Sequence, residues 1–232
     1  MSLATPGNPV IIARIVRTTH ALISVCALAA VTLFSACKPP KYIDYISEAG
    51  DFTASVPWGW SVYLDRQGDD YYNYTFVGPF EPDFHHGVPT LQVRWYGKNK
   101  VRSLPDGQLE TYASAKEFIE RTLRDVYGPE RELEVAPHPI TVAGWEATHF
   151  VVVGPMDVPA SARFGVYTDP KSKRTLVARR HAYVVVPMDN GFYAMIYPAT
   201  WDGFKKYEDR FNSLVHSFRV LKDGPGGPSL KK

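Results

Sequence analysis

Residues 183–197 read YVVVPMDNGFYAMIY, and the Asn190-Gly191 pair within this stretch predicts a tight hairpin turn. Asn and Gly both tolerate the left-handed backbone conformation that two-residue hairpin turns require. Apolar, β-favouring residues flank the turn on each side. The stretch therefore predicts two antiparallel strands, one ending a segment over 175–186 and the other over 192–197.

More short strands precede this hairpin. In Thr90–Tyr96, Leu91, Val93 and Trp95 alternate with Gln92 and Arg94, which is typical of a half-buried strand. The segment 154–174 is predicted as a long loop with a short strand over 164–167. The other predicted strands are Phe52–Val56, Ser61–Arg66, Tyr71–Val77, Leu133–Val142 with a break at Pro137–Pro139, and Trp145–Val153.

Two segments have the spacing of helices. Asp106 can cap a helix over Gly107–Tyr127, and Gly128-Pro129 ends it. Thr200 is predicted to cap a final helix. Its apolar stripe consists of Phe204, Tyr207, Phe211, Leu214, Val215 and Phe218. Four strands, a helix, four strands and a helix do not alternate as βαβ units, so the order predicts an α+β domain with a central antiparallel sheet and packed helices.

The first 36 residues have the layout of a secretory signal. Arg14 and Arg17 precede an uncharged run over 21–34, and the small residues Ser35 and Ala36 stand directly before Cys37. Phe34-Ser35-Ala36-Cys37 resembles the bacterial lipobox, in which the cysteine thiol receives a diacylglyceryl group and the peptide is cut just before it. The resemblance implies that Cys37 is lipidated and becomes the first residue of the mature protein.

The alternative to a cleaved signal is a retained transmembrane anchor, since Thr18–Ala36 is about long enough to span a bilayer. Its Ser, Thr and Ala content and its end at a cysteine favour cleavage. In both cases the domain is held at a bacterial membrane outside the cytoplasm. Lys38 after the cysteine favours the periplasmic face of the outer membrane in a Gram-negative host.

We therefore divide the 232 residues into a signal peptide over 1–36, a lipid-anchored tether over 37–41, an α+β domain over 42–221 and a disordered tail over 222–232. After cleavage about 196 residues remain, enough for one domain with its own core. Without Arg14 and Arg17, the 26 basic residues become 24 and equal the 24 acidic ones. This balance gives no basic footprint for nucleic acid.

No catalytic motif of the common hydrolases, nucleotide-binding proteins or metalloproteases occurs in the sequence. Cys26 lies in the leader and Cys37 is the lipidation site, so the mature domain has no disulfide and no thiol nucleophile. We expect no enzyme activity, no catalytic residue, no cofactor and no metal site.

Two groups of residues are candidates for binding. Asp83, His85 and His86 in the 78–89 loop could contribute to a metal or anion site, but adjacent histidines rarely chelate one ion, and an exposed polar loop is the favoured interpretation. Trp58 and Trp60 belong to an aromatic cluster that could be an exposed surface for a protein partner or a glycan, although ordinary strand packing is favoured. The remaining members of this cluster are Tyr63, Tyr71, Tyr72 and Tyr74.

Two motifs together resemble a known family of folds. Phe52, Pro57 and Trp60 form the pattern Phe-x-x-x-x-Pro-x-x-Trp, and the strand 191–197 is followed by a helix that ends in Ser217-Phe218. This arrangement is similar to the Mog1/PsbP-like fold, which includes DcrB-like exported lipoproteins. The resemblance implies an α/β/α sandwich in which the terminal Ser-Phe packs against the sheet, and a binding or accessory role without shared catalytic residues.

Three functions remain open. The preferred hypothesis is a non-catalytic, membrane-anchored lipoprotein that binds a protein partner or acts as an accessory subunit in the bacterial envelope. The second is a periplasmic module that binds a small ligand, a metal or a glycan. The third is a hydrolase with a dispersed active site.

Overall fold

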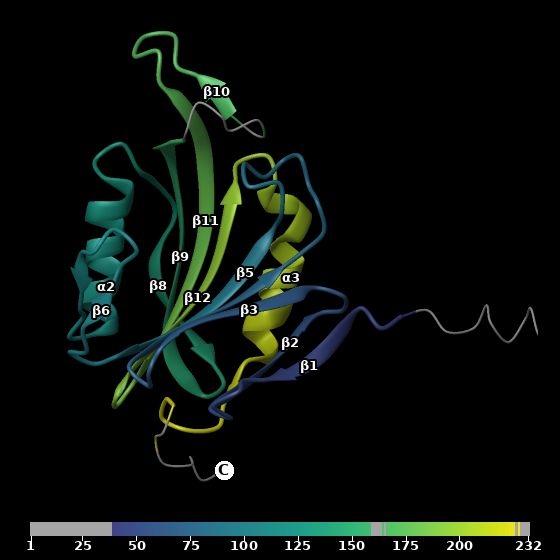
Figure 1. The fold of residues 1–232 in the computed structure, drawn as a ribbon, viewed down its shortest axis with the longest axis vertical. Helices are drawn as coiled ribbons and strands as arrows, with labels where there is room; N and C mark the ends of the chain where they lie inside the picture. The colour runs from purple at the N-terminus through teal and green to yellow at the C-terminus, as the bar shows by residue number, and fades with distance from the viewer. Residues whose placement is uncertain (1–38, 159–163, 165, 226, 228–232) are drawn as a thin grey trace, which may run out of the picture. The chain divides into compact units, whose positions relative to one another are not determined.

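The computed structural model describes residues 39–158, 164, 166–225 and 227. Its main sheet has the strand order β3-β4-β5-β12-β11-β9-β8, and β10 pairs with β11 outside this path (Figure 1). Every pair of neighbours is antiparallel. The strands are β3 (Ser61–Gln67), β4 (Tyr71–Val77), β5 (Thr90–Gly97), β8 (Glu132–Val142), β9 (Trp145–Asp157), β10 (Val166–Thr168), β11 (Thr175–Met188) and β12 (Gly191–Thr200).

The hairpin predicted at Asn190-Gly191 joins β11 to β12. Met188 pairs with Gly191 next to the turn, and the register continues to Arg179 opposite Thr200. β12 lies between β11 and β5, so it is covered by neighbours on both edges. The prediction of an antiparallel α+β fold is confirmed.

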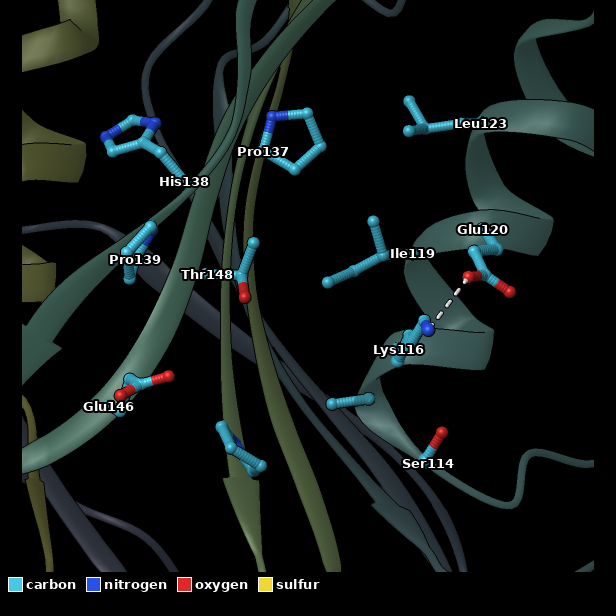
Figure 2. Close-up of a pocket in the computed structure, with 12 residues that line it drawn as sticks. Ser114, Lys116, Ile119, Glu120, Leu123, Pro137, His138, Pro139, Glu146 and Thr148 are labelled. Carbon is cyan, nitrogen blue, oxygen red and sulfur yellow. Dashed lines mark ion pairs between the residues drawn. The ribbon is translucent and has the colours of Figure 1, made fainter.

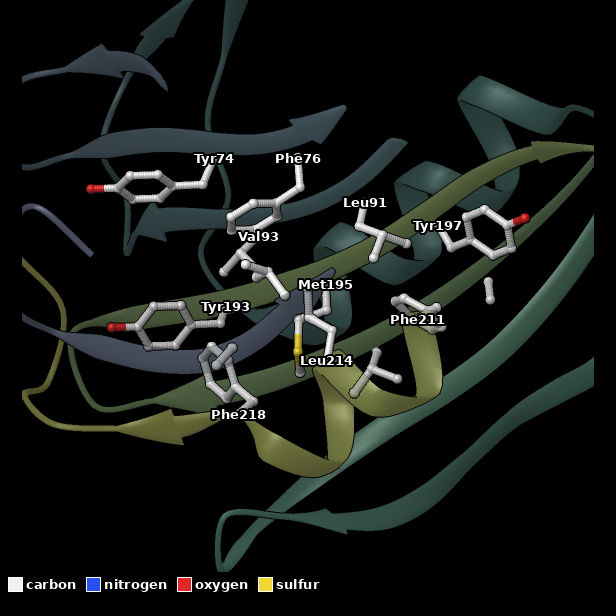
Figure 3. Packing of buried hydrophobic residues seen from close by; sticks show 14 of the residues in the cluster. Tyr74, Phe76, Leu91, Val93, Tyr193, Met195, Tyr197, Phe211, Leu214 and Phe218 are labelled. Carbon is white, nitrogen blue, oxygen red and sulfur yellow. The ribbon is translucent and has the colours of Figure 1, made fainter. Parts of the chain in front are cut away.

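One face of the sheet packs on helix α3 (Phe204–Ser217). Alternate residues of β12 point to this face, and Figure 3 shows Tyr193 and Met195 packed beside Leu214 and Phe218 of the C-terminal segment. The helix begins later than predicted, because Gly203 occupies the N-cap position. The Thr200 hydroxyl stabilises this start by accepting a hydrogen bond from the Gly203 N–H at 3.1 Å.

The opposite face packs on helix α2 (Ala115–Arg121) and the π-helical turn η1 (Thr122–Tyr127). The prediction of one helix over 107–127 is wrong, since its first part forms a small hairpin of β6 (Arg102–Ser103) and β7 (Leu109–Glu110). Ser114 caps α2 by accepting from the Glu117 N–H at 3.2 Å, and Glu117 accepts from the Ala113 N–H at 2.7 Å. These two hydrogen bonds at a Ser-x-x-Glu sequence fix the helix start at Ser114 and exclude Asp106 as the cap.

A second, three-stranded sheet has the order β1-β2-β13. Its strands are β1 (Tyr42–Ile46), β2 (Phe52–Pro57) and β13 (Arg219–Val220). Ser217 Oγ accepts from the Ser55 N–H at 2.8 Å, and the rings of Phe218 and Phe52 stack at 5.4 Å between centroids. The packing of Ser217-Phe218 that the family resemblance implies is therefore present.

Part of the predicted tail belongs to the packed domain. Asp223 is 6% exposed and accepts a hydrogen bond from the Asn190 amide at 2.6 Å. Lys222 Nζ donates to the Ala49 carbonyl at 3.0 Å. The prediction of a disordered tail from Lys222 onward is therefore wrong for residues 222–225. Residues 226 and 228–232 lie outside the described residues. The predicted signal peptide over 1–36 and the lipidation site Cys37 lie outside them as well.

Candidate functional site

The structure separates the two tryptophans that the sequence groups together. Trp58 is 53% exposed. Its backbone N–H donates to the Lys41 carbonyl at 3.2 Å, next to the first residues of β1. Trp60 is half-buried and packs edge-on against Tyr207 of α3 at 5.6 Å between ring centroids. Trp58 is therefore available at the surface, whereas Trp60 contributes to the packing of the domain.

The tyrosines of the predicted aromatic cluster divide in the same way. Tyr71, Tyr72 and Tyr74 of β4 are at most 2% exposed, so for them the favoured interpretation as packed strand residues is confirmed. Tyr63 of β3 is 63% exposed. No single aromatic surface includes all six residues.

The 78–89 loop is fastened to α3. Phe84 is 3% exposed and packs against Tyr207 at 6.0 Å between ring centroids. Glu81 accepts a hydrogen bond from the Tyr207 hydroxyl at 2.7 Å and forms an ion pair with Lys206. These contacts place Trp60 and the loop on the same helix, in a structural arrangement that the sequence reasoning missed.

Asp83, His85 and His86 do not converge on a common point. The Asp83 carboxylate lies 3.6 Å from Lys206 Nζ, and the rings of His85 and His86 lie 3.8 Å apart between centroids. Burial, together with the charge of His86, lowers the pKa of His85 to about 4. Within the described part of the chain, no three His, Cys, Asp or Glu side chains are placed to hold a metal ion.

One cavity is an open groove between α2 with η1 on one side and β8 with β9 on the other (Figure 2). Its volume is about 720 Å³. We call it the α2–β8 groove. Its lining residues are Ser114, Ala115, Lys116, Ile119, Glu120, Leu123, Pro137, His138, Pro139, Glu146, Thr148 and Pro187.

The walls of the groove are mainly apolar. Figure 2 shows Ile119 and Leu123 on the helical side, facing Pro137 on β8, with Thr148 between the strand and the helix; Pro139 of β8 also lines the groove. Ile119 is also part of the core beneath α2, so this wall is anchored by packing against the sheet. A preformed apolar surface of this kind can take up an apolar group without first reorganising.

Charged side chains stand at the rim of the groove. Lys116 and Glu120 are paired at 3.8 Å across one turn of α2, and both are largely exposed. Glu146 and His138 are exposed on the opposite side. Exposed pairs of this kind contribute little to folding stability, so the rim is free to interact with charges on a bound molecule.

The strand beside the groove is the outer edge of the main sheet. β8 contains Pro137 and Pro139, and its pairing with β9 shifts register between Leu133 and Val135 and again between Val135 and His138. Proline has no N–H, so this stretch cannot offer a continuous row of donors to an added strand. The side chains of the groove therefore offer more to a bound molecule than the backbone of this stretch does.

A buried polar cluster lies on the same face of the sheet, at the end of η1. The Tyr127 hydroxyl contacts His181 Nδ1 and lies 2.8 Å from the Tyr183 hydroxyl, and Arg179 stacks on the Tyr127 ring at 4.3 Å. Arg180 points to the other face, where it pairs with Glu134. Arg179, Arg180 and His181 therefore do not form one patch, because neighbouring strand residues face opposite sides.

Folding stability is expected to decrease as the pH falls from about 6.5 towards 3. Burial, and next the positive charge of Arg179, lowers the pKa of His181 from 6.5 to about 3. Between these values the unfolded chain binds a proton at this position that the folded chain does not, so acid favours unfolding. Urea unfolding between pH 4 and 7 should show a weaker pH dependence in His181→Gln than in the exposed control His216→Gln. An equal pH dependence in the two variants would contradict this assignment.

No protein-family model and no curated protein matches the chain. Solved structures match it across most of its length. Cyanobacterial PsbP (CyanoP) from Synechocystis has a TM-score of 0.46 and 12% identity, covering 80% of this chain and 95% of its own. The Ran-binding protein Mog1p of Saccharomyces cerevisiae has a TM-score of 0.41 and 12% identity, with 77% and 95% covered.

LpqN, which is involved in cell envelope biogenesis of Mycobacterium tuberculosis, is similar at a TM-score of 0.39 and 12% identity, covering 77% of this chain and 90% of its own. The Mog1/PsbP-like fold, which the sequence motifs resemble, is named after PsbP and Mog1p. At TM-scores below 0.5, these likenesses carry no conclusion about activity or partners.

No helix among the described residues has both the length and the apolar character needed to cross a bilayer.

Proposed function

We propose that this chain is a non-catalytic, lipid-anchored binding protein of the bacterial envelope, and that its α2–β8 groove receives a segment of a protein partner. The observation that carries the proposal is the groove itself, which has apolar walls, a charged rim and a helical wall packed on the core through Ile119. The proposal combines this surface with the lipobox-like sequence that ends at Cys37.

The shape of the groove favours a partner segment over an enclosed substrate. It is open to solvent, and its walls are formed by Ile119, Leu123 and two prolines, while the Lys116–Glu120 ion pair lies at the exposed rim. Apolar side chains of a partner can fill such a groove, while Lys116, Glu120 and Glu146 select the flanking charges.

A small apolar ligand is the second candidate. The volume of about 720 Å³ falls within the range of small-molecule pockets. The two candidates differ in what the groove holds in the cell, and one cross-linking experiment distinguishes them.

The groove is expected to cross-link to one envelope protein in intact cells. A photoreactive phenylalanine analogue is placed at Leu123, inside the groove, and as a control at Val126, three residues later and 55% exposed. Mass spectrometry should identify one stoichiometric protein adduct at position 123 and none at 126. A lipid or metabolite adduct at 123 would favour the second candidate, and equal labelling at both positions would contradict a groove function.

The lipid anchor is tested separately by mass spectrometry of the mature N-terminus. The expected first residue is Cys37 with a diacylglyceryl group, because the small residues before it match the cleavage position of the lipobox. At least two acyl chains then hold the protein firmly, since each buried methylene contributes about 0.8 kcal/mol. An unmodified Cys37 with the leader still attached would refute the anchor.

A further inference from the structure

The tip of the turn between β2 and β3 presents Trp58 to solvent. The backbone N–H of Trp60 donates to the Pro57 carbonyl at 3.4 Å, and Gly59 has a φ of 80°. This is the geometry of a type II turn, in which the third residue needs the positive φ that glycine adopts freely. The second residue, Trp58, consequently points away from the domain and is 53% exposed.

This turn lies beside the point where the chain enters the domain. The backbone N–H of Trp58 donates to the Lys41 carbonyl at 3.2 Å, and Lys41 stands four residues after Cys37. Four residues span at most about 14 Å. A lipid on Cys37 would therefore keep Trp58 close to the membrane surface, whatever the path of those residues.

The side chains at this end of the domain suit a membrane surface. Ile43, two residues after Lys41, is 44% exposed, and Lys41 is itself exposed. Tryptophan accumulates at the boundary between lipid headgroups and acyl chains, because its ring is apolar and its N–H is polar. Lysine near the same boundary is attracted by anionic lipids.

We propose that Trp58 inserts into the headgroup region of the membrane that holds the lipid on Cys37, and that this second contact fixes the orientation of the domain on the membrane. The inference rests on the lipid anchor in the proposed function, and it assigns to Trp58 a lipid surface in place of a protein partner.

The test uses the full-length, lipidated protein in vesicles of phosphatidylethanolamine and phosphatidylglycerol, with and without phospholipids brominated near the headgroup end of the acyl chains. Bromine quenches tryptophan fluorescence only at short range. We expect brominated vesicles to quench the wild type, and we expect Trp58→Phe to lose most of this quenching. The matched control is Trp201→Phe, since Trp201 is 50% exposed on the turn before α3, and this variant should be quenched as the wild type is.

The outcomes separate the inference from the anchor. Protein that floats with the vesicles but shows no quenching that depends on Trp58 refutes the membrane contact and leaves the anchor intact. Protein that does not float refutes the anchor, and the inference with it. Neither substitution removes a buried ring, so circular dichroism should show the same unfolding temperature for all three proteins.

Discussion

Phe218→Ala is expected to lose about 3–5 kcal/mol of folding free energy. Phe218 is fully buried where α3 ends, and its ring lies 5.4 Å from that of Phe52 and 5.3 Å from that of Tyr193. It therefore joins β2 near the start of the domain, β12 at the centre of the sheet and the last helix. Removing the ring leaves a cavity in the middle of this contact.

Urea unfolding followed by circular dichroism measures the loss. The matched control is Phe80→Ala, because Phe80 is 64% exposed in the 78–89 loop, and its loss should be below about 1 kcal/mol. Similar losses in the two variants would show that Phe218 has no special place in the core.

Asp51→Ala is expected to cost about 2–4 kcal/mol, since three buried hydroxyl groups would lose a charged acceptor. Asp51 is fully buried and accepts hydrogen bonds from Ser47, Tyr72 and Tyr193, the last at 2.7 Å. Burial raises the pKa of Tyr72 and the pKa of Tyr193 above the ordinary value for tyrosine. Both hydroxyls therefore stay protonated and can donate to Asp51.

The backbone of Asp51 takes part in the same junction. Its carbonyl accepts from the Leu221 N–H at 2.6 Å and from the Lys222 N–H at 3.1 Å, so the residue also holds the C-terminal segment. Asp44→Ala is the control, because Asp44 is exposed and accepts one hydrogen bond, from Ser55. Urea unfolding should separate the two variants clearly, and a loss for Asp51→Ala no larger than for Asp44→Ala would refute the network.

The antiparallel architecture could be predicted because its signals are local. The Asn190-Gly191 turn, the alternation in Thr90–Tyr96 and the stripe of the last helix each depend on neighbouring residues, and the structure contains all three elements. The helix start was mispredicted, since Asp106 and Ser114 are both capable caps. The Ser114-x-x-Glu117 sequence was the decisive local signal, since Ser114 caps the Glu117 N–H and the Glu117 carboxylate accepts from the Ala113 N–H.

The candidate site was far harder to predict, because its residues meet only in the folded chain. Leu123, Pro137 and Thr148 come from three different elements, and no spacing in the sequence relates them. Trp58 and Trp60 are two positions apart and share a residue type, yet a turn exposes one and α3 covers the other. Sequence patterns describe single elements well, whereas a groove is a property of their packing.

The most direct test of the proposed function is the affinity of the cross-linked partner for groove variants of the lipidated protein. Thr148→Trp places a large ring between the two walls, and Thr141→Trp adds the same ring at an exposed position on the β8–β9 hairpin, outside the groove. Both variants should unfold at similar urea concentrations. We predict that Thr148→Trp weakens binding by at least about tenfold, which corresponds to about 1.4 kcal/mol, while Thr141→Trp binds as the wild type does. Unchanged binding by Thr148→Trp would contradict the account.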